Sequence, residues 1–355
     1  MLKPQGSVRR LKSVAGWLLA AGFCLGPWPP AQAAGPMEHY GALMDTLVAG
    51  FYGAADTICA RISAGHAGHP ASLYARGTVL YTRLIDSEDS AGRAEFFKLA
   101  DSCARLCEEW RDAGREEPSL LAYIRGSALS SAGIILMRAG KLVAGLRKLL
   151  AARHEFDAAI EADPQSYDAY LGRGTYRCAM AQHASVLGVL PFIPDLESGL
   201  RDLRLAADSS RWSRWAALNA LAWFTLDERE YYLADSLCDV GLVRFPGSRT
   251  FLWPKLAVQV RQEHWAEAEE TGLRLLQEYL ADPQNNGYET TTLYWRLMIC
   301  ADQLGRPEAA ESYARSGLAV RRTEDVERRR KEKIEAMRER LSQSSADSRS
   351  ENRGR

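Results

Sequence analysis

A recurring spacing of small and aromatic residues constrains the fold of this chain more than any other feature. In the segment AARHEFDAAIEADP, a small, an aromatic, a small residue and a proline follow at intervals of 4, 3 and 5, as Ala152, Phe156, Ala159 and Pro164. The same intervals return in LADSLCDVGLVRFP. One weaker copy begins at Ala268, and another begins at Ala309 and continues through Tyr313 and Ser316. Because such positions share one helix face, the spacing predicts helices that approach a partner closely through small residues.

Further helical segments alternate with these copies. The candidate partner helices occupy 166–181, 213–227, 250–262 and 289–304, and polar breaks such as DERE, RQEH and LGRP follow them. A helix–break–helix unit of about 34 residues is typical of tetratricopeptide repeats (TPRs), which stack into a solenoid. The chain is also rich in Ala, Leu, Arg and Glu, which favour helices. We therefore predict an all-α protein, a right-handed α-α superhelix of TPR-like helix pairs.

Composition divides the chain into four parts. Residues 1–33 combine a basic start, a short apolar run and the segment AQA, which predicts a cleaved signal peptide; an uncleaved anchor helix is the alternative. We expect divergent N-terminal helical repeats or a cap at 34–118 and a TPR-like array at 119–320, with an apolar insertion at about 186–196. The charged residues 321–355 predict a helical extension and a disordered tail, or else a contact with an acidic partner or a membrane surface.

Several segments between 120 and 260 carry a family resemblance. They include the long helix pair before an Asp-Pro turn, the helix YDAYLGRGTYR, the insertion with LPFI and the turn FPGS. This part of the chain resembles a group of exported bacterial TPR proteins and, more distantly, a eukaryotic repeat family that contains a mitochondrial outer-membrane inclusion-clearance protein. The resemblance implies a helical superhelix that acts as an interaction module or assembly factor in the cell envelope. It implies no common activity.

Two glycines in YDAYLGRGTYR raise the question of a phosphate-binding loop. Such a loop requires a strand before the glycines, a third glycine and a helix after them. Gly172 and Gly174 lie inside a helical pattern instead, and Arg177 stands at the third position. We therefore expect Gly172 to let its helix touch a partner helix. Gly174 has no clear role in the repeat, and close approach by the insertion at 186–196 is one explanation.

Other signals of chemistry are weak. His66 and His69 lie in a Gly/Pro turn without a nearby carboxylate, so we expect a solvated turn there and not a metal site. Neither H-E-x-x-H nor G-x-S-x-G occurs in the chain. We interpret the cysteines beyond the signal peptide as small core residues; they are Cys59, Cys103, Cys107, Cys178, Cys238 and Cys300. We predict no catalysis, no metal and no cofactor. The remaining alternative is a hydrolase whose catalytic triad comes from residues that are distant in the sequence.

The predicted binding site is the concave surface that first helices line in arrays of this kind. Counting positions within the repeats gives five partner-binding candidates, which are Arg173, Tyr176, Arg177, Asn219 and Trp223. Arginine, tyrosine and tryptophan are typical of interaction hot spots; core packing is the alternative for the two aromatic residues. Basic and acidic residues number 45 each, which favours a protein or peptide partner and not nucleic acid. We predict no stable membrane insertion after signal cleavage.

Two functions remain from this reasoning. The first is an exported scaffold in the periplasm or cell envelope, with an open groove in which Arg173 and Asn219 are exposed. The second is a solute-binding accessory protein of an envelope transport system, with an enclosed pocket under the insertion at 186–196. Burial of Arg173 and Arg177 in ion pairs within the array would contradict the groove.

Overall fold

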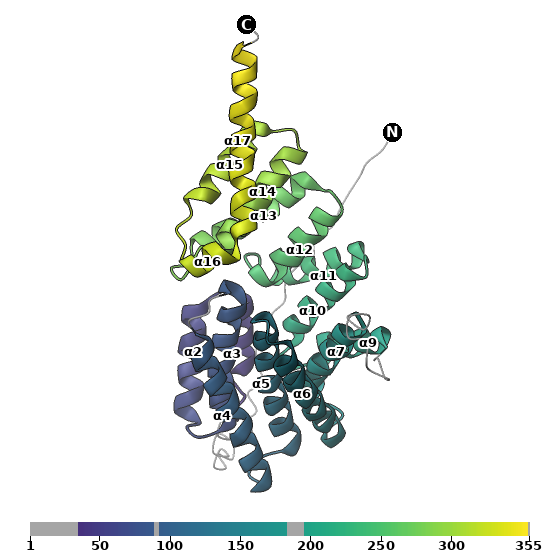
Figure 1. Cartoon of the computed structure of the whole chain (residues 1–355). Helices are drawn as coiled ribbons and strands as arrows, with labels where there is room; N and C mark the ends of the chain where they lie inside the picture. The colour runs from purple at the N-terminus through teal and green to yellow at the C-terminus, as the bar shows by residue number, and fades with distance from the viewer. Residues whose placement is uncertain (1–34, 89–91, 183–194, 354–355) are drawn as a thin grey trace, which may run out of the picture. The chain divides into compact units, whose positions relative to one another are not determined.

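The computed structural model describes residues 35–88, 92–182 and 195–353, which form helices and no strand (Figure 1). The chain divides into two units, 1–35 and 36–355, and the helices belong to the second. The predicted signal peptide and residues 186–194 of the predicted insertion lie outside the described residues. The helices are α1 (Tyr40–Val48), α2 (Tyr52–Gly65), α3 (Pro70–Ser87), α4 (Arg93–Asp112), α5 (Pro118–Arg138), α6 (Leu142–Ala162), α7 (Tyr167–Gln182), α9 (Leu196–Ser209), α10 (Arg214–Asp227), α11 (Tyr231–Arg244), α12 (Arg249–Arg261), α13 (Trp265–Leu280), α14 (Tyr288–Gln303), α15 (Pro307–Ala319), α16 (Glu324–Arg329) and α17 (Lys331–Arg353).

Each described helix from α1 to α14 packs against the next described helix in the chain. The contacts are most extensive between α5 and α6 and between α7 and α9. Helices two places apart also meet, as α3 does with α5 and α10 with α12. This consecutive packing, without a strand in the described residues, confirms the predicted all-α fold class of TPR-like helix pairs.

Small residues of the recurring spacing lie buried between helices. Ala152, Ala159, Ala234 and Ala268 are at most 1% exposed. In the last copy the expected register is wrong by one residue, because the buried positions are Ala310, Ala314 and Gly317. The adjacent alanines at 309 and 310 make the spacing ambiguous in the sequence. Packing decides it, since Tyr294 of α14 and Met337 of α17 fill the space beside the backbone of Gly317.

The two glycines of YDAYLGRGTYR face different helices. A Cβ at Gly172 would overlap the ring of Phe156 on α6, so this glycine allows the predicted contact with the partner helix. A Cβ at Gly174 would lie 2.9 Å from the carbonyl oxygen of Gly199 on α9. Gly174 therefore admits the backbone of α9, and the explanation based on the insertion at 186–196 is not needed. Both glycines serve helix packing.

Segments from the N-terminal and C-terminal parts of the second unit are in direct contact. Ser248 donates a hydrogen bond of 2.6 Å to the carbonyl oxygen of Val48, and Asn286 donates one of 2.9 Å to that of Ser87. At the end of α3, Glu88 pairs with Arg329 of α16 at 2.7 Å. These contacts join residues about 200 positions apart, so the array closes on itself.

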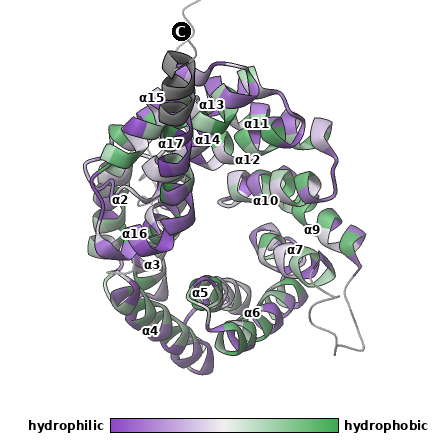
Figure 2. Ribbon diagram, turned by 45° about the horizontal axis from the view of Figure 1, so that its top comes forward, coloured by the Kyte–Doolittle hydropathy of each residue, from purple (hydrophilic) through white to green (hydrophobic). Residues whose placement is uncertain are grey.

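The charged C-terminal segment is part of this closure. Val326 of α16 and Ile334 and Met337 of α17 are buried, and α17 packs against α14 and α15. Figure 2 shows how hydrophilic α17 otherwise is. The helix continues to Arg353, through the serine-rich stretch for which we expected a disordered tail. The domain boundaries drawn from the sequence stay predictions.

One helix in the described part of the chain, α5, is long and apolar enough to cross a membrane by length and composition alone. In the structure, 56% of its apolar window is buried. It packs against α3, α4, α6 and α7, with Leu121, Ile124 and Ile135 among its buried residues. These contacts are those of a core helix of the array.

Candidate functional site

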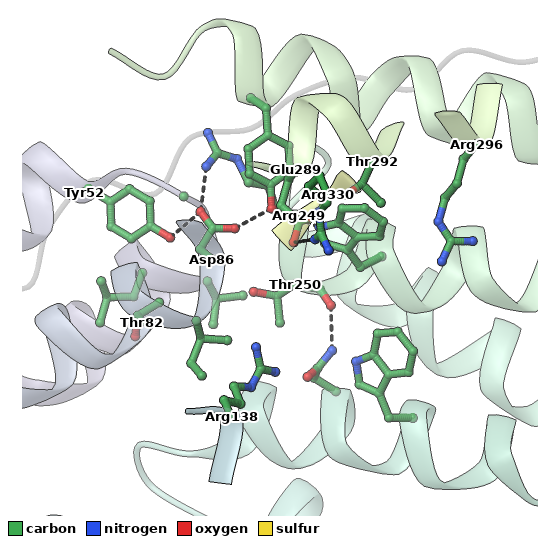
Figure 3. Close-up of a pocket in the computed structure, with 18 of the residues that line it drawn as sticks. Tyr52, Thr82, Asp86, Arg138, Arg249, Thr250, Glu289, Thr292, Arg296 and Arg330 are labelled. Carbon is green, nitrogen blue, oxygen red and sulfur yellow. Dashed lines mark hydrogen bonds and ion pairs between the residues drawn. The ribbon is translucent and has the colours of Figure 1, made fainter. Parts of the chain in front are cut away.

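A cavity of about 610 Å³ lies where the two ends of the array meet. Its lining comes from α1, α2, α3 and α5 on one side and from α10, α12, α13, α14 and α17 on the other. Figure 3 shows polar side chains from both sides that point toward one another. The charged and tryptophan residues of the lining are Asp86, Glu289, Arg138, Arg249, Arg296, Arg330, Lys333, Trp223, Trp253 and Trp295.

Asp86, near the end of α3, is the centre of one polar network in this cavity (Figure 3). Its carboxylate accepts hydrogen bonds from Tyr52 at 2.8 Å, from Arg249 at 2.6 Å and from Tyr279 at 2.6 Å. Arg249 also pairs with Asp282 at 3.0 Å. Burial acts to lower the pKa of Arg249, but the charges of Asp86 and Tyr279 and the hydrogen bonds to Asp86 and Asp282 together outweigh it, so the pKa is raised. This network is fully engaged in holding the ends of the array together.

Glu289, on the first turn of α14, faces the guanidinium of Arg330 at 3.6 Å. Burial raises the pKa of Glu289 to about 7, although Arg330 acts against this shift. Arg330 is held in place by its own bonds, because its Nε donates to the carbonyl oxygen of Tyr288 and its guanidinium lies 3.3 Å from the centre of that ring. This carboxylate is therefore a weak counter-ion near neutral pH.

Arg296 and Lys333 lie close together on another part of the wall, and within the described residues neither has a carboxylate partner. The Arg296 guanidinium lies 6.0 Å from the rings of both Trp253 and Trp295. The ammonium group of Lys333 lies 4.8 Å from the centre of Trp295. Burial lowers the pKa of Arg296; burial and the charges of Arg330 and Arg296 lower that of Lys333. In Figure 3, Arg296 stands apart from the network around Asp86.

A second cavity of about 350 Å³ shares lining residues with the first, so the two adjoin. Asn219, Thr250 and Thr82 belong to both. Its wall is rich in tyrosines: the rings of Tyr40 and Tyr74 stack at 4.8 Å, and further hydroxyl groups of serine and threonine face the same space. The inner surface thus runs from a cationic region to a region of aromatic and hydroxyl side chains.

Two of the five predicted binding residues form ion pairs with another helix of the array. Arg173 pairs with Asp202 of α9 through two bonds of 2.8 Å, and Arg177 pairs with the same carboxylate at 2.8 Å. Asp202 is 6% exposed and requires such partners, because a buried carboxylate without them is strongly destabilising. These ion pairs hold α7 to α9. Both arginines are ion-paired but only half-buried, so whether they also contact a partner stays a prediction.

The other three candidates lie in different places. Tyr176 is half-buried beside Arg153, whose guanidinium lies 5.9 Å from the ring. Asn219 and Trp223 line the large cavity, and the amide of Asn219 donates to the carbonyl oxygen of Thr250 at 2.6 Å. Asn219 is half-buried, and its amide is held by this bond in the cavity wall. Whether any of these three contacts a partner stays a prediction.

Sequence reasoning missed the cations and carboxylates of the cavity. Asp86 comes from the segment interpreted as a cap, and Lys333 comes from the segment interpreted as a solvated extension. Arg296 follows Trp295 on a helix that the repeat spacing did predict. The available signal was the basic run from Arg328 to Lys333, but the residues that line the cavity with it lie far away in the sequence.

Histidine and cysteine positions also differ in part from expectation. His69 is buried and not solvated: its Nδ1 accepts from the backbone of Ala71 to cap α3, and its Nε2 bonds Glu116 at 3.0 Å. The six cysteines are free and buried, as expected for core residues. Within the described residues no group of three or more His, Cys, Asp or Glu could hold a metal ion.

Comparison with known proteins adds little to this geometry. No protein-family model matches the chain, and no curated protein matches it. Among solved structures, the chain is similar to yeast Tom70 over 87% of its own length and 89% of that chain, with 11% sequence identity and a TM-score of 0.33. A likeness of this TM-score carries no argument about fold or function. The fold rests on the packing described above, and the site on its own contacts.

Proposed function

We propose that this chain is an exported TPR scaffold of the bacterial cell envelope that binds a protein or peptide partner in its cavity, without catalysis. The lining of the cavity carries this proposal. Tryptophan, tyrosine and arginine dominate protein recognition sites, and here all three line one cavity from both ends of the array. The closing contacts hold these side chains in place before a partner arrives, which lowers the entropic cost of binding.

The two carboxylates of the cavity support binding over acid-base chemistry. Asp86 accepts three hydrogen bonds from side chains of the array. Glu289 faces Arg330. A general base must have a lone pair within reach of the proton that it abstracts from a substrate. Carboxylates that are occupied by the fold itself are poorly placed for that task.

Affinity capture with paired variants tests the proposed function. Trp223 lines the cavity, whereas Tyr232 on α11 is 89% exposed. We expect the intact chain and the Tyr232→Ala variant to retain the same polypeptide from the envelope, and the Trp223→Ala variant to lose it. Retention of that polypeptide by Trp223→Ala, with loss from Tyr232→Ala, would place the partner on the outer surface and contradict the proposal.

A solute-binding accessory protein of an envelope transport system is the second candidate. It is favoured by the size of the cavity, since pockets for small ligands commonly measure about 300–1,000 Å³. The pocket expected for this function under the insertion at 186–196 involves residues outside those described. Native mass spectrometry of the chain purified from its envelope separates the two functions. A bound small molecule without a polypeptide supports the solute-binding protein.

A further inference from the structure

We propose that Arg296 (labelled in Figure 3) and Lys333 form a binding site for an oxyanion, a carboxylate or phosphate group carried by a ligand with an aromatic or apolar body. This inference deepens the proposed function, because it assigns a chemical class to whatever occupies the cationic region of the cavity. It rests on the cavity as the binding site but not on the occupant being a polypeptide.

Arg296 is the first observation. Its Nε is buried without a hydrogen-bond partner, and it forms no ion pair within the described residues. The Nε atoms of Arg83, Arg125 and Arg249 are also buried and unpaired, but the terminal nitrogens of those three arginines pair with carboxylates. Arg296 differs from them because no carboxylate in the described part of the chain forms an ion pair with it. Buried charges in proteins are normally paired, so this guanidinium is prepared for an anion.

Lys333 is the second, independent observation, since it comes from α17 and not from α14. Its ammonium group contacts the ring of Trp295 and has no carboxylate partner among the described residues. Burial lowers its pKa, as do the charges of Arg330 and Arg296. Two adjacent cations that repel each other in a partly buried place are stabilised together by one anion.

Neither carboxylate of the cavity supplies that anion. Asp86 is already bonded to Tyr52, Arg249 and Tyr279. The charge of Glu289 acts on Arg296 and Lys333, but its ion pair is with Arg330, at 3.6 Å, and it forms none with either of these two. Burial also raises the pKa of Glu289 to about 7, so its negative charge is only partial near neutral pH. The charge of Arg296 and Lys333 is therefore left for a ligand.

The tryptophans indicate the remainder of the ligand. The indole of Trp253 donates its N–H to the hydroxyl oxygen of Tyr279 at 2.9 Å, which fixes the ring beside Arg296. The ring of Trp295 lies within 6.0 Å of both charged groups. An oxyanion held by these cations would place its attached group near two large aromatic faces. A small aromatic carboxylate or phosphate matches both features.

Calorimetric titration of the full chain with three probes tests this site. The probes are hippurate, phenyl phosphate and the neutral amide hippuramide. We expect at least one anionic probe to bind and hippuramide to bind about tenfold more weakly or not at all, because charge-assisted bonds would be lost. The preferred anion then distinguishes a carboxylate from a phosphate ligand. Equal binding of hippurate and hippuramide, or no binding of either anion, overturns the inference.

Variants separate a binding role from a structural one. Arg296→Gln should weaken binding of the anionic probe about tenfold, whereas Arg296→Lys should retain part of the affinity. The exposed control Arg201→Gln on α9 should leave the affinity for the probe unchanged. Thermal unfolding without ligand should leave Arg296→Gln as stable as the parent, because no ion pair is lost. Unchanged probe affinity in Arg296→Gln overturns the inference, even where a polypeptide is still captured and the proposed function stands.

Discussion

Arg249 on α12 donates a hydrogen bond of 2.6 Å to Asp86 on α3, and 163 positions of the chain separate the two residues. Helices that are distant in the sequence are thereby joined through one buried pair. Arg249 extends the connection to α13 by a bond of 2.6 Å to the carbonyl oxygen of Glu278. Because this pair lines the large cavity, the contacts that close the array also form its candidate binding site.

Removal of the Asp86 charge should destabilise the whole unit. In the Asp86→Asn variant, Arg249 keeps its ion pair with Asp282 but loses its ion pair with Asp86. We therefore expect a loss of about 2–4 kcal/mol in the free energy of unfolding. The matched control is Asp227→Asn, which removes an exposed partner of Arg261 and should cost less than about 1 kcal/mol. Urea unfolding measures both, and equal losses would contradict the importance of the closing pair.

The two glycines of α7 should not tolerate a methyl group. We expect Gly172→Ala and Gly174→Ala each to destabilise the protein by about 1–3 kcal/mol, because the added Cβ would meet Phe156 or the backbone of Gly199. Gly77 in α3 has open space at the same place, so Gly77→Ala should stabilise by about 0.5–1 kcal/mol through helix propensity. Denaturant midpoints compare the three variants. Stabilisation by Gly174→Ala would show that α9 does not approach α7 this closely.

Stability should depend on pH through Glu289. Burial raises its pKa from 4.5 to about 7, so the folded chain holds this proton to a higher pH than the unfolded chain does. The stabilisation by this proton is complete below pH 4.5 and is lost as the pH rises through 7. The total loss in the free energy of unfolding is up to about 3 kcal/mol. We therefore expect Glu289→Gln to stabilise the chain more at pH 8 than at pH 4. Unfolding curves at both values measure the difference, and the reverse order would refute the raised pKa.

Processing of the N-terminus tests export. The basic start, the apolar run and the segment AQA predict cleavage after Ala33. N-terminal sequencing of the chain from the periplasmic fraction should therefore begin at Ala34. An intact Met1 on a membrane-bound chain would favour the anchor helix instead.

The spacing in the sequence predicted the helix pairs because small residues at fixed intervals are a local property of each repeat. Ala152 and Ala159 are buried as that spacing requires. Local reasoning failed where two small residues were adjacent, as at Ala309 and Ala310, since only packing against α17 selects one register. It also failed for His69, whose partner Glu116 lies 47 positions away.

The candidate site was less predictable than the fold. Asn219 and Trp223 were found because a repeat fixes which positions face inward. Arg173 was assigned to the same surface, but the sequence did not reveal that Asp202 would occupy it. The meeting of Asp86, Arg249 and Lys333 depends on how the whole array closes, and no spacing within one repeat encodes that contact.

Photo-cross-linking from within the cavity tests the central claim most directly. A photoreactive residue replaces Trp223 in one full-length chain and the exposed Tyr232 in another, and both are irradiated in the native envelope. We predict that a polypeptide adduct forms from position 223 and that none forms from position 232. An adduct from position 232 with none from position 223 would contradict binding within the closed array.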